Sequence, residues 1–193
     1  MIEASAAAFA CDILGLERSG DCAAIVRGMA SFSAYSDVQQ EGCRALGRLA
    51  RDPTTKALVA DEGGIAVVLA ALRFHQRHAG VQQHGCSALW QLSDNDAVGV
   101  AGTGATELVL DAMRTHAGIP ELQRMGCAFL CTVAKNYTAH KAAIARGGGV
   151  DAALAALRTH AGHARVEGAA CKMLCSLAWS NPGTQTRKHD RCR

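Results

Sequence analysis

The stretch VQQHGCSALWQL, residues 81–92, decides the fold because the chain repeats its pattern. Aligned without a gap, the pattern has an apolar or small residue at its first, fifth, ninth and twelfth positions and a cysteine at its sixth. These positions lie on one face of a helix with about 3.6 residues per turn. The pattern therefore predicts a long amphipathic helix that occurs four times, with its cysteine at Cys43, Cys86, Cys127 and Cys171.

A second block precedes each of the last three long helices. Apolar residues at helical spacing lead to an arginine eight residues before the long helix, at Arg73, Arg114 and Arg158. Two small residues introduce this middle helix, and glycine there accepts the positive φ of a sharp corner; the pairs are 63–64, 104–105 and 148–149. A shorter apolar turn comes before each corner, around Val59, Val100 and Ile144. Each unit is therefore predicted to contain a short, a middle and a long helix.

The fifth residue of the long helix is always small, being Gly42, Gly85, Gly126 or Ala170. Glycine inside a helix costs about 1 kcal/mol relative to alanine, so we expect it to allow another helix to approach closely. The cysteines recur every 41 to 44 residues, and all of this variation lies between a long helix and the next glycine corner. Loops tolerate such changes in length, whereas packed helices do not.

A single unit cannot bury both faces of its helices, so we expect the units to stack into one repeat domain over residues 1–183. An apolar helix in residues 1–19 fits no complete unit and is expected to cover the first one. Residues 184–193 are polar and basic and are expected to be disordered. The C-terminal end has no evident polar cap, which predicts a longer array or self-association there. The predicted units are 20–51, 52–94, 95–135 and 136–181.

Composition narrows the classes of function. Apolar residues make up 49% of the chain and aromatics only 4%, which suits helix packing better than a sheet core. A net charge of +3 indicates no strongly basic face, so no nucleic-acid partner is expected. The acidic N-terminus is unlike a signal peptide, and no segment has the roughly 18 apolar residues of a membrane span. Nine cysteines, an odd number, are typical of core residues in a reducing compartment, so we expect a cytoplasmic or nuclear location.

The three-helix unit, with its glycine-introduced middle helix and its Val-Gln-x-x-small-x-x-x-Leu-x-x-Leu long helix, resembles the armadillo repeat over roughly residues 20–181. The HEAT repeat is the alternative, but it has two helices per unit, and the short helices argue against it. The resemblance implies an all-α, right-handed α–α superhelix of about four three-helix repeats. It also implies that the long helices line a concave groove that binds extended peptides or folded partners.

In the family's peptide-binding members an Asn and a Trp on each long helix grip the ligand. The Asn positions correspond here to Arg48, Gln91, Thr132 and Ser176, and the Trp positions to Arg44, Ser87, Ala128 and Lys172. Most of these side chains can still form hydrogen bonds, and the arginines and lysine favour an acidic ligand over a basic one. The predicted partner-binding groove consists of Gln40, Arg44, Arg48, Gln83, Ser87, Gln91, Arg124, Thr132, Lys172 and Ser176.

Other repeated or paired residues suggest more specialised chemistry. Cys127 with Cys131, and Cys171 with Cys175, stand four apart and could each supply half of a metal site. Core packing explains all four, so no metal is expected. His75, His116 and His160 each follow an arginine by two residues and could sense pH. We favour a simpler interpretation, in which the Arg and His lie in the last turn of the middle helix, where positive charge suits the exposed carbonyls.

Catalysis has little support in the sequence. It contains no Gly-x-Ser-x-Gly elbow and no Gly-x-x-x-x-Gly-Lys phosphate loop, so neither an enzyme nor a cofactor is expected. The leading hypothesis is a non-enzymatic scaffold or adaptor that binds a protein or peptide, acidic in character, along the groove. One alternative is a nuclear-import-type cargo adaptor, although that class uses the Asn and Trp ladder on basic peptides. The other is a structural segment of a longer repeat array.

Overall fold

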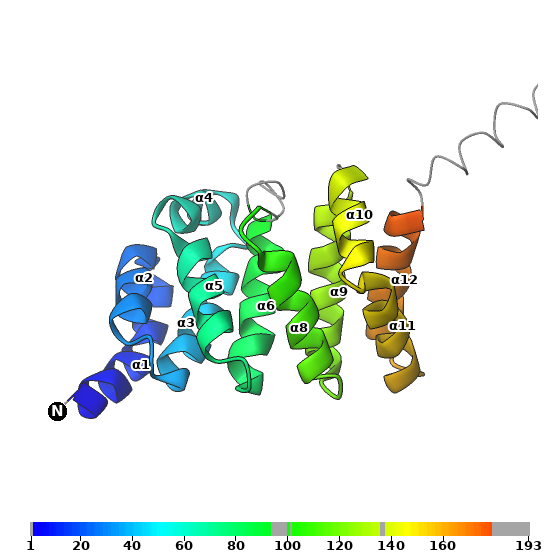
Figure 1. Ribbon diagram of the computed structural model, residues 1–193. Coiled ribbons are helices and arrows are strands. Elements are labelled where there is room, and N and C mark those ends of the chain that lie inside the picture. Colours follow the sequence, from blue (N-terminus) through cyan, green and yellow to red (C-terminus); the bar gives the residue numbers. More distant parts are fainter. Residues whose placement is uncertain (1, 94–99, 101, 136–137, 179–193) are drawn as a thin grey trace, which may run out of the picture.

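The computed structural model describes residues 2–93, 100, 102–135 and 138–178, and every regular element in these residues is a helix. Figure 1 shows the helices standing side by side along the chain. Val100 is helical and buried, but most of the short helix predicted around it, like the predicted tail 184–193, lies outside the described residues. The helices are α1 (Ile2–Ser19), α2 (Cys22–Ser31), α3 (Ser36–Leu49), α4 (Pro53–Asp61), α5 (Gly64–Phe74), α6 (Ala79–Ser93), α8 (Ala105–Thr115), α9 (Pro120–Ala134), α10 (Thr138–Arg146), α11 (Gly149–Thr159) and α12 (Ala164–Ala178).

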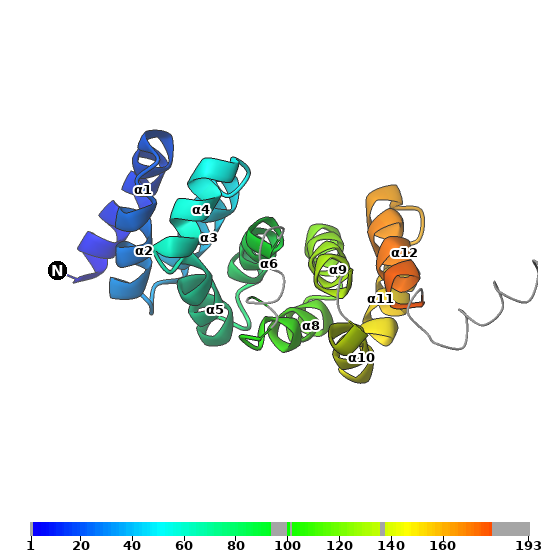
Figure 2. The same ribbon diagram turned by 90° about the horizontal axis from the view of Figure 1, so that it is seen from above.

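The helices form two curved layers, seen from above in Figure 2. The long helices α3, α6, α9 and α12 each pack on the next along the inner side of the arc. The middle helices α2, α5, α8 and α11 form the outer layer. The structure thereby confirms the predicted all-helical α–α superhelix with its four long helices.

The N-terminal helix α1 occupies the inner layer and packs lengthwise on α3, as a preceding long helix would. It buries Ala6 and Ile13 and packs on both helices of the first unit, α2 and α3. The first unit, 20–51, contains only α2 and α3, so the three-helix pattern begins with α4. Asp21 caps α2 by accepting a hydrogen bond from the Ala24 amide.

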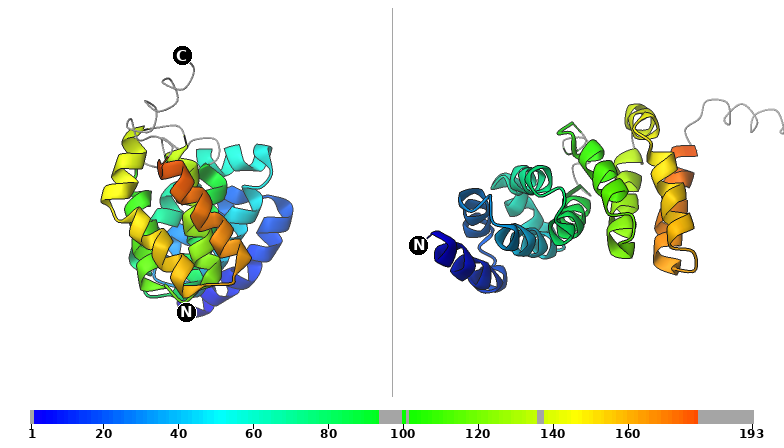
Figure 3. Two further views of the ribbon diagram at one scale, coloured as in Figure 1. Left: turned by 90° about the vertical axis from the view of Figure 1, so that its right-hand side faces the viewer. Right: turned by 60° about the horizontal axis from the view of Figure 1, so that its bottom comes forward.

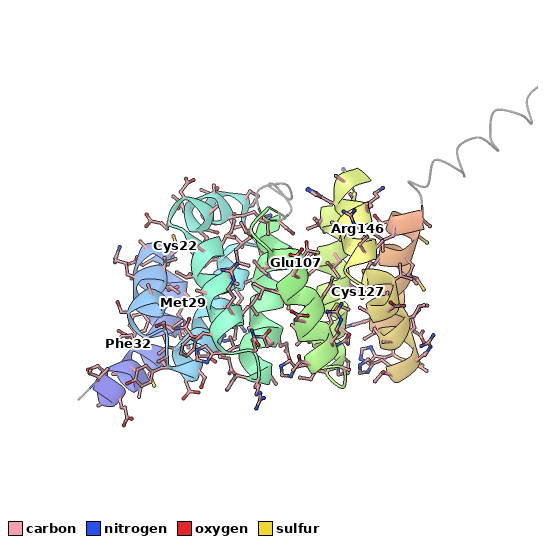
Figure 4. All side chains as sticks on the ribbon, viewed as in Figure 1. Cys22, Met29, Phe32, Glu107, Cys127 and Arg146 are labelled. Atoms are coloured by element: carbon pink, nitrogen blue, oxygen red, sulfur yellow. The ribbon has the colours of Figure 1, made fainter. Side chains whose placement is uncertain are left out.

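Glycine has two roles in the repeat: it forms the corner before each of three middle helices, and it leaves room on the long helices for a neighbouring side chain. Gly63, Gly104 and Gly148 cap the middle helices with φ of 82°, 79° and 88°, which confirms the predicted corners. A Cβ on Gly126 would lie 2.5 Å from Sδ of Met113, and Gly42 meets Met29 (labelled in Figure 4) in the same way. The small fifth residue of the long helix therefore admits a large side chain of the middle helix in its own unit.

A buried glutamine fastens each of the first three middle helices to its long helix. Gln82 Nε2 donates to the carbonyls of Leu72 and His75, at 2.9 and 3.0 Å. These carbonyls belong to the C-terminal turn of α5, where the helix itself provides no donor. Gln39 and Gln123 make the same pair of bonds to the ends of α2 and α8, and all three side chains are 2% exposed.

The last unit departs from this rule. Glu167 stands at the equivalent position, and a carboxylate cannot donate to a carbonyl. Its Oε1 instead accepts a hydrogen bond from the Gly162 amide at 2.7 Å. The C-terminal carbonyls of α11 therefore lack the amide donor that the other three middle helices have.

The arginine and histidine at the ends of α5, α8 and α11 lie where the sequence predicted, and all of them except Arg158 bond to a neighbouring unit. Arg73 Nη2 donates to the Thr103 carbonyl of the next corner at 2.9 Å, and Arg114 Nη2 likewise donates to the Gly147 carbonyl. The histidines bond backwards through Nε2, at 2.8–2.9 Å, to one carbonyl of the preceding unit. The three pairs are His75 with Ser33, His116 with Gln76, and His160 with Ala117.

Replacing Gln82 with Met should lower the free energy of unfolding by about 1–3 kcal/mol, because the buried Leu72 carbonyl loses its side-chain donor and the His75 carbonyl keeps only the His78 amide, while the volume changes little. Urea unfolding followed by circular dichroism measures this. Gln83→Met is the matched control: the neighbouring side chain is half-buried, and its substitution should change stability by no more than about 0.5 kcal/mol. Equal losses in the two variants would contradict the assigned role.

Candidate binding groove

The inner face of the arc contains three hollows among its long helices. The first, which we call the N-terminal hollow, has a volume of about 180 Å³ and is lined by Arg44, Gly47, Arg48, Arg51, Gln83, His84, Ser87, Glu121 and Met125. The second, which we call the C-terminal hollow, has a volume of about 590 Å³ and is lined by Trp90, Arg124, Ala128, Cys131, Thr132, Lys135, Ala164, Arg165, Gly168, Ala169 and Lys172.

The third hollow, of about 610 Å³, joins the other two. It shares Gln83 and Glu121 with the N-terminal hollow and Ala164 and Arg165 with the C-terminal hollow. Its remaining lining comes from the turns that precede α9 and α12, at Ile119, Pro120, Gly162 and His163. The three hollows therefore form one continuous strip across α3, α6, α9 and α12.

Seven of the ten groove residues predicted from the sequence line this strip. The N-terminal hollow contains Arg44, Arg48, Gln83 and Ser87, and the C-terminal hollow contains Arg124, Thr132 and Lys172. The other three, Gln40, Gln91 and Ser176, are half-buried on the same long helices but line none of the three hollows.

Two of the three arginines of the N-terminal hollow, Arg44 and Arg48, are paired with carboxylates, whereas Arg51 is exposed and forms no ion pair with another described residue. Arg44 bonds Glu41 through Nε at 2.7 Å and through Nη2 at 2.5 Å. Glu17 of α1 reaches both arginines, with Oε1 3.3 Å from Arg48 Nη1 and Oε2 3.8 Å from Arg44 Nη1. The sequence predicted that Arg44 and Arg48 favour an acidic ligand, but in the structure both already have carboxylate partners.

Arg124 of the C-terminal hollow is held by a carboxylate and an aromatic ring. Its Nε and Nη2 donate to the two oxygens of Glu121 at 2.9 and 2.6 Å. Its guanidinium carbon lies 5.7 Å from the centroid of the Trp90 ring, within reach of a cation–π interaction. The hydrogen bond from Arg124 is the main reason that the pKa of Glu121 lies below its usual value.

Lys135, Arg165 and Lys172 give the C-terminal hollow its charge. All three side chains are exposed, and none forms an ion pair with another described residue. The described lining of this hollow includes no acidic side chain. Three unpaired cations line this hollow and one, Arg51, lines the N-terminal hollow, so the excess of positive charge on the inner face is larger at α9 and α12 than at the end of α3.

Sequence reasoning missed the residues that decide this charge distribution. Glu17, Glu41 and Glu121 form ion pairs with arginines of the groove. Trp90, which contacts Arg124, was missed as well, because the equivalent positions of the other long helices hold Gly47, Cys131 and Cys175. Two signals were available, because Glu41 precedes Arg44 and Glu121 precedes Arg124 by three residues, a spacing that favours ion pairs on a helix. The pairing through Glu17 depends on packing and has no local signal.

His84 lies in the N-terminal hollow close to these charges. Burial lowers its pKa below the usual value, Arg44 and Arg48 lower it further, and Glu41 opposes them. Because the folded chain resists protonation more than the unfolded chain, the contribution of His84 to stability is complete above pH 6.5 and is lost as the pH falls.

Thermal unfolding measured from pH 7 to pH 5 should therefore show a smaller loss of stability for His84→Gln than for the wild type. Ser87→Ala is the control, because it changes a half-buried polar side chain of the same hollow and leaves the imidazole in place, so it should follow the wild-type curve. If both variants follow the wild-type curve, His84 does not titrate as argued.

Three of the four repeated cysteines have thiols of low reactivity. Burial raises the pKa of the Cys43, Cys86 and Cys127 thiols to about 12, and all three are fully buried. In the part of the chain that the structure describes, no three His, Cys, Asp or Glu side chains come together as metal ligands. Cys43, Cys86 and Cys127, the last of which is labelled in Figure 4, instead belong to the hydrophobic core, whereas Cys171 is exposed.

Iodoacetamide labelling of the native protein, read residue by residue by mass spectrometry, should separate two groups of thiols. Cys11, Cys171 and Cys175 are exposed and should react quickly. Cys43, Cys86 and Cys127 should react only on the timescale of unfolding, because they are buried and remain protonated. Rapid labelling of Cys86 in the folded chain would contradict this assignment.

Comparison with known proteins adds evidence on the fold. No protein-family model and no curated protein sequence matches the chain. A crystal structure described as an engineered protein, from the Northeast Structural Genomics Consortium, is similar to it with a TM-score of 0.67. The two share 21% identity, and the similarity covers 88% of this chain and 67% of the engineered one. At this identity the likeness supports the helical superhelix alone, and the armadillo assignment stays a prediction.

No described helix combines the length and the apolar character needed to cross a membrane.

Proposed function

We propose that this chain is a non-enzymatic, armadillo-like interaction scaffold, and that it binds an acidic segment of a partner protein in the C-terminal hollow. The observation that carries the proposal is the 590 Å³ hollow in which Lys135, Arg165 and Lys172 have no carboxylate partner among the described residues. Complementary charge of this kind guides a partner to the site and selects it against others.

The shape of the site favours an extended segment. The three hollows share lining residues and run across successive long helices, so an occupant can lie along them rather than in one enclosed cavity. Gln83, Ser87 and Thr132 offer polar groups along the same strip. At the N-terminal end Arg44 and Arg48 are paired and only Arg51 is unpaired, so the acidic part of the ligand belongs at α9 and α12, where three cations are unpaired.

Trp90 and Arg124 supply a rigid surface beside the free cations. Because both oxygens of Glu121 hold one edge of its guanidinium, Arg124 loses little freedom when a ligand binds. Trp90 is half-buried and still lines the hollow, and partly buried aromatic side chains of this kind are enriched where binding energy is concentrated. These two residues give the site a fixed shape in addition to its positive charge.

A fluorescently labelled, Glu-rich peptide tests the proposal by anisotropy. Replacing Arg165 and Lys172 together with Glu should weaken binding by about tenfold or more at physiological salt, since attraction becomes repulsion. Arg27→Glu with Arg77→Glu changes the net charge equally and alters exposed residues outside the hollows, so this control should bind nearly as tightly as the wild type.

Trp90 supplies a local readout. The chain has two tryptophans, so in a Trp179→Phe background Trp90 is the only one and its emission should change when the Glu-rich peptide binds. Equal weakening in the control variant would mean that binding follows net charge rather than the hollow. Tighter binding of a Lys-rich peptide than of the Glu-rich one would favour the cargo-adaptor alternative.

A further inference from the structure

Among the described residues the stack ends at α11 and α12, and this end has the surface of an internal unit without its neighbour. Figure 3, left, looks onto this end. Cys127 and Leu130 of α9 are 0% exposed, because α12 covers them. At the equivalent positions of α12, Cys171 is exposed and Leu174 is only half-buried. The same side chains that form the core between two units are thus uncovered here.

The arginine that bonds to the next unit also lacks its partner at this end. Arg73 and Arg114 each donate forward to the carbonyl that precedes the next corner glycine. The corner glycines have positive φ, and the arginine lies beside them: a Cβ would stand 2.9 Å from Arg114 Nη2 at Gly148 and 3.7 Å from Arg73 Nη2 at Gly104. Arg158 occupies the equivalent position on α11, is exposed, and forms no hydrogen bond or ion pair with any described residue.

The histidine bonds between units imply a free carbonyl acceptor at this end. Each histidine bonds to a carbonyl one unit earlier, and these carbonyls belong to Ser33, Gln76 and Ala117. The next carbonyl in the series is that of Ala161, in the turn between α11 and α12, and no described side chain donates to it. A donor at Arg158 and an acceptor at Ala161 therefore flank the uncovered apolar surface.

We propose that the α11–α12 face binds a further unit of the same repeat. The occupant is defined by its chemistry: a helical unit whose glycine corner turns a carbonyl toward Arg158 and whose middle helix ends in a histidine that reaches the Ala161 carbonyl. Its long helix covers Cys171 and Leu174 as α12 covers Cys127 and Leu130. The two internal interfaces after α5 and α8 show both bonds in place, which sets the register of docking.

A second copy of this chain fits the face less well. Its opposite end would have to supply the histidine from the end of α2, where Phe32 stands instead. Phe32 packs between Phe9 and Tyr35, with ring centroids 5.6 and 6.2 Å away, and has no donor to offer. Stacking of identical chains would leave the Ala161 carbonyl unpaired, so the occupant is a unit that carries the histidine.

The test inserts one more unit into the full chain. A copy of residues 135–178 placed after Ala178 repeats the spacing between Cys127 and Cys171 and provides a corner glycine and a histidine in register. Iodoacetamide labelling of Cys171, measured against Cys11 in the same molecule, should slow by about tenfold or more in the extended chain because the new unit buries it. A second version carries a copy of residues 94–134, so that the result does not depend on the folding of one insert.

Arg158→Ala provides the second readout. It should lower the melting temperature of either extended chain by about 2–4 °C and leave that of the original chain unchanged, since only the extended chain offers a partner carbonyl. Arg114→Ala is the positive control and should lower the melting temperature of both. Circular dichroism establishes that the insert adds helix before the comparison is made.

Three results would overturn the proposal. In the first, Cys171 reacts with iodoacetamide as fast in the folded extended chains as in the original chain, or Arg158→Ala lowers the melting temperature of the extended and original chains equally. In the second, labelling of Cys171 in the original chain slows as its concentration rises, which assigns the face to a second copy. In the third, deleting residues 179–193 speeds the labelling of Cys171, which assigns the face to that segment.

Discussion

The amide of a buried glutamine is the interaction on which the stack depends. In each of the first three units it donates to two carbonyls at the end of the middle helix, and so holds that helix at one height and angle on the long helix. The last turn of the middle helix then projects its arginine and histidine toward the neighbouring units. Contacts within a unit thereby set the geometry of contacts between units, and the curvature of the inner face follows.

That geometry also explains why the charge of the groove changes along its length. The long helices present the same positions to the inner face in every unit, but the acidic partners come from different places. Glu17 comes from α1, which exists only at the N-terminal end, and its carboxylate lies between Arg44 and Arg48. No such helix covers the other end among the described residues, and Lys172 remains open to a ligand.

Much of the architecture could be predicted from the sequence, because the same local pattern occurs in several units and each occurrence strengthens the prediction of its helices and corners. The helical spacing around Cys86, the glycine corners and the small residue at Gly85 all describe contacts within a unit or with an identical neighbour. The site was harder to predict, because it depends on side chains that break the repeat. Trp90 and Glu17 each occur once at their positions, so alignment of the units hides them. The roles of Gln82 and His116 were missed for another reason: their acceptors are main-chain carbonyls, which leave no mark in the sequence.

The exchange of glutamine for Glu167 has a consequence for the order in which the stack comes apart. In a linear array the stability of each unit is the sum of its own bonds and those to its neighbours, and an end unit has only one neighbour. The last unit combines this position with a middle helix whose terminal carbonyls lack the amide donor. We therefore expect α11 and α12 to open first when the chain is stretched or warmed, and the region from α1 to α9 to remain folded as they do so.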